Sequence, residues 1–143
     1  DIHSRGFRVA LGESLTSILE LEYIVRNDLI DIVQLDVTHS GDFNNLSALV
    51  RKCSKTIAIH NWGSMLGLAQ NLILTNLINK DCYFELPLYL TRLDLDIIEF
   101  LGLTRENYLS KIIDVDPFDL LSAAQQVILK QPDTSVTNDF NWT

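Results

Sequence analysis

The 143-residue sequence contains only two cysteines and one methionine. Cys53 and Cys82 lie neither in a C-x-x-C pair nor at metal-ligand spacing from a histidine. We therefore expect both to be reduced core thiols, which is typical of a cytoplasmic protein. The sequence also lacks a long hydrophobic run, since its longest apolar stretch, 65–78, is short and interrupted by polar residues. No membrane partner is expected.

Basic residues are scarce as well. Eleven lysines and arginines stand against nineteen acidic residues, for a net charge of −8. A duplex-binding protein needs basic side chains to displace counterions from phosphates, so we expect no nucleic-acid partner. A small anionic substrate remains compatible with this charge, because a bound divalent metal reverses its sign locally. The start of the sequence lacks a signal peptide and an initiator methionine, which fits a piece of a longer chain.

The sequence does contain a repeated alternation of strand-like and helix-like segments. Four strands are predicted, at 7–11, 31–35, 56–59 and 82–84. The helices between them are predicted at about 15–24, 43–53 and 65–78, with Asp42 as the N-cap of the second. Such alternation implies a parallel sheet with right-handed crossovers. We predict an α/β fold: a partial (β/α) barrel of about four βα units, followed by a helical tail.

The predicted domain organisation follows from this pattern. Residues 1–90 are expected to form the C-terminal half of a (β/α) barrel catalytic domain, and residues 91–131 a helical tail. Within the tail, Asp116-Pro117 has the form of a cap followed by a first helical residue, which predicts a helix from Pro117 to Lys130. Residues 132–143 are expected to be disordered.

An ionisable residue stands just after each predicted strand: Glu13, Asp36, His60 and Glu85. They follow one another at intervals of 23, 24 and 25 residues, about one βα unit each. In a (β/α) barrel the carboxyl ends of all strands surround one mouth, where active sites lie. The alternative is that each is merely a polar residue where a buried strand meets solvent. Four residues in matched register favour a site.

Four stretches around these residues resemble the later barrel strands of the enolase superfamily, and most closely the branch of mandelate racemase and the acid-sugar dehydratases. The stretches are Leu-Gly-Glu-Ser at 11–14, and residues 33–41, 57–64 and 83–85. The resemblance implies that Glu13 is a ligand of Mg²⁺ and that Asp36 pairs with His60. It further implies that Glu85 hydrogen-bonds the substrate carboxylate. The N-terminal half of that family has no counterpart in these 143 residues, so the site is expected to be incomplete in this chain alone.

The implied activity is abstraction of the proton alpha to a carboxylate, as in dehydration or racemisation of a 2-hydroxy acid through an enediolate. A neutral imidazole at His60 is suited to take this proton, and Asp36 could hold the ring in one tautomer. The expected partner is a small carboxylate such as a sugar acid, and a homo-oligomer is compatible with the sequence. His39 is expected to serve the loop, and Trp62 either to stack on substrate or to plug the loop against the barrel.

Two other interpretations stay open. One is a non-catalytic, truncated barrel module that keeps the motifs and acts as a binding or structural protein. The other is an unrelated α/β protein whose strand-end residues agree by chance. The presence of two further acidic strand ends upstream of residue 1 would favour the enzyme.

Overall fold

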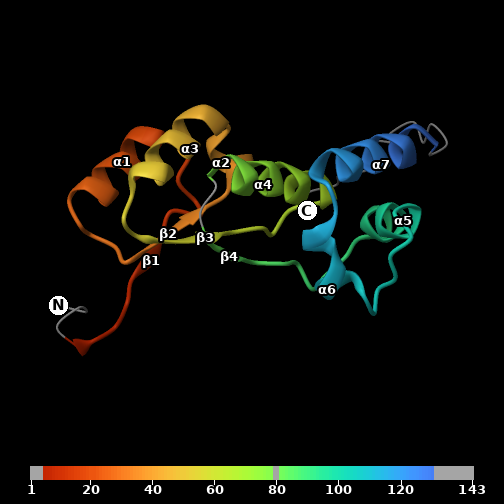
Figure 1. Ribbon diagram of the computed structural model, residues 1–143, viewed down its shortest axis with the longest axis horizontal. Coiled ribbons are helices and arrows are strands. Elements are labelled where there is room, and N and C mark those ends of the chain that lie inside the picture. The colour runs from red at the N-terminus through yellow and green to blue at the C-terminus, as the bar shows by residue number, and fades with distance from the viewer. Residues whose placement is uncertain (1–4, 79–80, 131–143) are drawn as a thin grey trace, which may run out of the picture.

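The computed structural model describes residues 5–78 and 81–130. Its centre is a four-stranded, fully parallel sheet with the order β1-β2-β3-β4 (Figure 1). The strands are β1 (Ala10–Leu11), β2 (Ile32–Leu35), β3 (Thr56–Ile59) and β4 (Tyr83–Phe84). The register aligns Leu11 with Val33, Leu35 with Ile59, and Ile59 with Phe84. The predicted α/β fold with about four βα units is confirmed, while the expected disorder of 132–143 lies outside the described residues.

The first strand is shorter than the predicted 7–11, for a local reason. The backbone N–H of Val9 donates to the side chain of Asp31 at 2.7 Å instead of to a neighbouring strand. The Val9 carbonyl accepts from both Asp31 and Ile32, so the regular ladder begins only at Ala10. A side-chain hydrogen bond of this kind competes with strand pairing, and periodicity does not reveal it.

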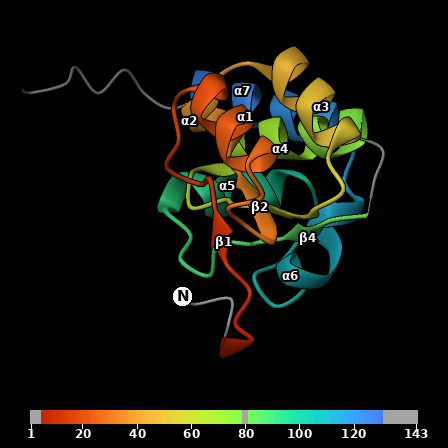
Figure 2. The same ribbon diagram turned by 90° about the vertical axis from the view of Figure 1, so that its left-hand side faces the viewer.

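Helices α1 (Ile18–Arg26), α3 (Phe43–Lys52) and α4 (Met65–Ile78) lie over the same face of the sheet in both views (Figures 1 and 2). Helix α4 has the predicted bounds, and Asp42 caps α3 as predicted, accepting from the Asn45 amide at 3.0 Å. The short helix α2 (Val37–Ser40) was not predicted. Asp36 is its N-cap, and Gly41 ends it in the left-handed region at φ 68°.

The buried core follows from the alternation of side chains along the central strands. Val33 and Leu35 of β2, with Ile57 and Ile59 of β3, are almost fully buried beneath the helices. Gln34 points the other way and is only partly buried, because successive strand residues face opposite sides of the sheet. Neither cysteine forms a disulfide within the described ranges.

The predicted helical tail is present and packs against the barrel-like part of the chain. It comprises α5 (Arg92–Phe100), α6 (Tyr108–Lys111), a 3₁₀ turn η2 (Ile112–Asp114) and α7 (Pro117–Lys130), the last with its predicted bounds. Residues of α4 such as Leu68 share a second apolar cluster with Ile97, Ile112 and Leu120. Helix α4 therefore stands between two cores. None of the described helices is long and apolar enough to cross a membrane.

Candidate active site

The parallel sheet brings the four predicted residues to one edge. Glu13, Asp36, His60 and Glu85 all follow the carboxyl ends of their strands, and these strands are neighbours in sequence order. The amide of His60 donates to Leu35 O at 2.7 Å, and the amide of Glu85 donates to Ile59 O at 2.9 Å. These two backbone bonds place His60 directly beside the end of β2 and Glu85 directly beside the end of β3.

Glycine at position 12 is required for this arrangement. Gly12 has φ +131°, which side-chain-bearing residues rarely adopt. A Cβ at this position would lie 2.3 Å from the carbonyl oxygen of Gln34. The turn that carries Glu13 thus approaches β2 more closely than a residue with a side chain at position 12 would allow.

His60 stands at the centre of the cluster. Its Nδ1 is 3.3 Å from Asp36 Oδ2, and its Nε2 is 3.7 Å from Glu13 Oε2 and 4.0 Å from Glu85 Oε2. The imidazole is 13% exposed, while the two glutamate side chains are 44% and 41% exposed. One nitrogen of the ring therefore faces a buried carboxylate, and the other faces a partly open space lined by two more. The predicted pairing of Asp36 with His60 is geometrically in place.

Asp36 is 4% exposed and is held by several donors. Its Oδ1 accepts from the amide and hydroxyl of Thr38, at 2.9 and 2.6 Å, and from Nδ2 of Asn71 at 3.1 Å. Burial alone would raise the pKa of Asp36, but hydrogen bonds from Thr38, Asn71 and His60 outweigh it and leave the pKa below its ordinary value. Asp36 is thus ionised at neutral pH, so its Oδ2 can only accept a hydrogen bond from Nδ1 of His60.

Two residues that the sequence patterns did not assign to the site, Thr38 and Asn71, donate hydrogen bonds to Asp36. Thr38 is near Asp36 in sequence, and an N-cap Asp typically accepts from the backbone N–H two or three residues further on, which is where Thr38 lies. Asn71 is 35 residues away, in the middle of α4. The only sequence signal for it is an amide within an apolar helix, which marks a buried polar residue but not its partner.

The roles expected for two other residues change. His39 lies on helix α2 rather than in a loop, and its Nδ1 is 3.6 Å from Asp36 Oδ2 with the side chain half exposed. Trp62 is 82% exposed, so it does not plug the loop against the described part of the chain. Asn61, between His60 and Trp62, is instead the buried residue of that loop, at 1% exposure.

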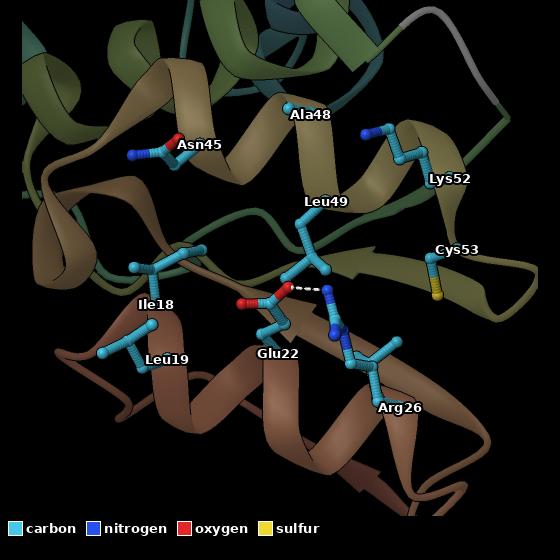
Figure 3. Close-up of a pocket in the computed structure, with 10 residues that line it drawn as sticks. Ile18, Leu19, Glu22, Arg26, Asn45, Ala48, Leu49, Lys52 and Cys53 are labelled. Atoms are coloured by element: carbon cyan, nitrogen blue, oxygen red, sulfur yellow. Dashed lines mark hydrogen bonds and ion pairs between the residues drawn. The ribbon is translucent and has the colours of Figure 1, made fainter.

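A cavity of about 500 Å³ lies away from this cluster, between α1 and α3 (Figure 3). Its walls are largely apolar, and its ionic pair, Glu22 and Arg26, is internally satisfied. None of the four strand-end residues lines it. The candidate chemistry therefore belongs to the strand ends, where a nitrogen and three carboxylates converge.

The described residues do not by themselves fit a magnesium ion. No group of three or more His, Cys, Asp or Glu side chains within 5–78 and 81–130 is arranged to hold a metal. Magnesium demands near-octahedral oxygen coordination at about 2.0–2.1 Å. Glu13 offers one carboxylate at the carboxyl end of β1, and His60 Nε2 lies 3.7 Å from its Oε2.

The geometry defines a segment of a parallel β/α barrel with an ionisable cluster at the carboxyl ends of its strands. The family described as "Enolase C-terminal domain-like" matches residues 2–107. The chain belongs to the enolase superfamily. The match extends past Glu85, the last residue of the four similar stretches, and into the helical tail. No curated protein and no solved structure matched the chain.

Proposed function

We propose that this chain supplies part of an active site, at the carboxyl ends of its four strands. The completed site removes the proton alpha to the carboxylate of a 2-hydroxy acid, such as a sugar acid. The observation that carries the proposal is the environment of His60. Its Nδ1 is 3.3 Å from the buried Asp36 carboxylate, and its Nε2 faces the space between Glu13 and Glu85. An imidazole oriented in this way is a suitable general base.

In the proposed step, Nε2 of His60 accepts the α-proton while the electron pair of the C–H bond moves toward the carboxylate to give an enediolate. Asp36 stabilises the imidazolium that forms, since it is already ionised beside Nδ1. In a racemisation, a second acid supplied by the completed barrel gives a proton to the opposite face, and His60 keeps the proton it has taken until solvent removes it. In a dehydration, the His60 imidazolium gives its proton to the departing β-hydroxyl group, which leaves as water while the electron pair of the enediolate forms the carbon–carbon double bond. Both outcomes fit the family, and the mandelate racemase and acid-sugar dehydratase branch is our proposal for this chain.

The remaining roles require residues outside those described. Glu85, whose Oε1 lies 3.4 Å from Nε2 of Gln34, is placed to bond a substrate carboxylate. Glu13 would be one ligand of a magnesium ion whose other ligands lie outside the described residues, and the ion would stabilise the negative charge that develops on the substrate carboxylate. We place this enzyme in the cytoplasm, consistent with two cysteines that form no disulfide in the described ranges.

The outer edge of β1 supports completion by further polypeptide. Within the described residues β1 pairs only with β2. Large apolar side chains on β1, on the segment before it and on α1 are exposed, namely Phe7 at 63%, Leu11 at 45%, Leu19 at 70% and Tyr23 at 64%. Another parallel βα unit, from this polypeptide or from a second copy, would pair with the strand and cover this strip.

The test is deuterium exchange at the α-carbon. The protein carrying a completed barrel is incubated with a panel of sugar acids in D₂O, and loss of the α-proton signal is followed by NMR. We expect exchange with at least one acid and its loss in His60→Asn. A protein that binds the acids but exchanges none would favour the alternative of a non-catalytic module.

A further inference from the structure

Asn71 is a fully buried amide in the middle of the most apolar helix of the chain. It is 0% exposed, and its neighbours on α4 include the buried Leu72 and Leu74. Burying an amide without hydrogen-bond partners is unfavourable, so its presence here needs a reason. The reason is visible in its hydrogen bonds, which all lead to the candidate active site.

The Asn71 side chain joins the ends of β2 and β3. Its Oδ1 accepts from the amide of Val37 at 3.0 Å. Its Nδ2 lies 3.1 Å from Asp36 Oδ1 and 3.1 Å from the carbonyl oxygen of His60. A weaker contact, 3.4 Å, leads to Asn61 Oδ1. The backbone amide of Val37 can only donate, so the amide oxygen must face it and the NH₂ group must face Asp36 and His60.

This orientation decides which oxygen of Asp36 remains for the imidazole. Oδ1 is occupied by Asn71 and by both donors of Thr38. Oδ2 is left to face Nδ1 of His60. The same amide also holds the backbone of His60 through its carbonyl. Both members of the pair are therefore fixed by one side chain that touches neither Nε2 nor the open space beside it.

We propose that Asn71 is a positioning residue of the proton-abstraction site, which keeps the proton of neutral His60 on Nδ1 and leaves Nε2 free to act as base. This inference rests on the proposed function for its catalytic meaning. Its structural content, the tautomer of His60, is measurable in the 143-residue chain without substrate.

The experiment compares two variants of Asn71 with the same changes at Asn76, an exposed asparagine five residues along the same helix. Asn71→Asp keeps the size of the side chain and the acceptor for Val37, but turns a repelling oxygen toward Asp36. Asn71→Leu removes all polar contacts without adding charge, and serves if the buried carboxylate prevents folding. The tautomer is read from the ¹⁵N shifts of the His60 ring in long-range ¹H–¹⁵N spectra, with circular dichroism as the control for folding.

In the unchanged chain and in Asn76→Asp and Asn76→Leu, we expect one tautomer with the proton on Nδ1. In a folded Asn71 variant, the two ring nitrogens should move toward the averaged shifts of mixed tautomers. With the completed barrel, kcat should fall about 10- to 100-fold with KM nearly unchanged, as expected for a supporting residue. A folded Asn71 variant that keeps the single Nδ1–H tautomer would overturn the proposal. The positioning role would survive a failure of the proposed function, which would appear separately as exchange that does not depend on His60.

Discussion

Two buried aspartates, both tied to helix α4, show how similar surroundings serve different ends. Asp36 is 4% exposed and Asp94 is 3% exposed, and each accepts hydrogen bonds from a nearby threonine. Asp94 also accepts from the amide of Met65 at 2.9 Å, at the first residue of α4. Its Oδ2 accepts from the amide and hydroxyl of Thr91 in a capping box that begins α5. Asp94 therefore uses both oxygens to join two helix starts.

The difference lies in what remains available after the local bonds are made. Oδ2 of Asp36 faces the His60 imidazole, whose other nitrogen lies beside two partly exposed glutamates. The titratable neighbour of Asp94 is Tyr108, which is buried. Burial, with the charge of Asp94, raises the pKa of Tyr108 to about 12, so this phenol keeps its proton at neutral pH. Its hydroxyl is buried and has no hydrogen-bond partner within the described ranges. Burial and hydrogen bonding are therefore common to both aspartates, and what distinguishes Asp36 is that its Oδ2 faces the imidazole of His60.

The largest expected effect concerns activity at Asp36. In the completed barrel, Asp36→Asn should lower kcat by about 10²- to 10⁴-fold, because the amide no longer selects the tautomer or stabilises the imidazolium. KM should stay within about twofold, since Asp36 does not reach the substrate in this account. Steady-state kinetics measure both. Asp94→Asn is the matched control, and an equal loss of kcat there would remove the distinction between the two aspartates.

Replacing Asp94 is expected to affect folding stability rather than activity. Asp94→Ala leaves the Met65 amide and the Thr91 hydroxyl without their acceptor and should lower the free energy of unfolding by about 2–4 kcal/mol. Urea denaturation of the 143-residue chain measures it. Asp96→Ala, on the same helix, removes only the surface pair with Arg92 and should cost less than about 1 kcal/mol. Equal costs would mean that Asp94 does not join the helices as described.

The loss of folding stability in acid should depend more on Asp36 than on a surface aspartate. Its pKa is lowered in the folded state, so the unfolded chain binds more protons near pH 4. This contribution to stability is present above about pH 4 and is lost as the pH falls through the folded pKa. Asp36→Asn should therefore flatten the acid side of the stability profile. Asp42→Asn should flatten it less, because Asp42, whose pKa the Asn45 amide lowers, is at the surface. An unchanged acid profile in Asp36→Asn would contradict the network around Asp36.

The smallest expected signal is the binding of magnesium to the chain alone. Both buried aspartates are held by hydrogen bonds, and Glu13 would be a single ligand, since no group of three metal-binding side chains is present among the described residues. We expect a dissociation constant above about 1 mM by calorimetry, because one carboxylate does not replace enough of the ion's hydration shell. Micromolar affinity would show that this chain contains a magnesium-binding set of ligands other than Glu13 alone.

Much of this arrangement was predictable from spacing. Because parallel strands share one carboxyl edge, regular intervals between Glu13, Asp36, His60 and Glu85 were enough to expect them at one mouth. The bounds of α4 and α7 were likewise predictable, from a continuous apolar pattern and from the Pro117 start. The catalytic and metal-binding roles of the four strand-end residues stay predictions.

Other features depend on contacts that local patterns do not contain. Helix α2 has four residues, too few for a periodic signal, and is set by the cap at Asp36. The bonds of Asn71 reach residues 34 and 35 positions away, to Val37 and Asp36. The link from Asp94 to Met65 spans 29 residues. Each requires the packing of α4 against its neighbours, which arises only from the tertiary fold.

The most direct test of the central claim compares the two histidines that lie near the same oxygen of Asp36. His60 Nδ1 is 3.3 Å from Oδ2 and His39 Nδ1 is 3.6 Å from it, but only His60 also faces Glu13 and Glu85. The rate of α-proton exchange in D₂O is measured for His60→Asn and His39→Asn in the completed barrel. We predict a loss of at least about 100-fold for His60→Asn and a change within about threefold for His39→Asn. Exchange at the unchanged rate in His60→Asn would contradict it.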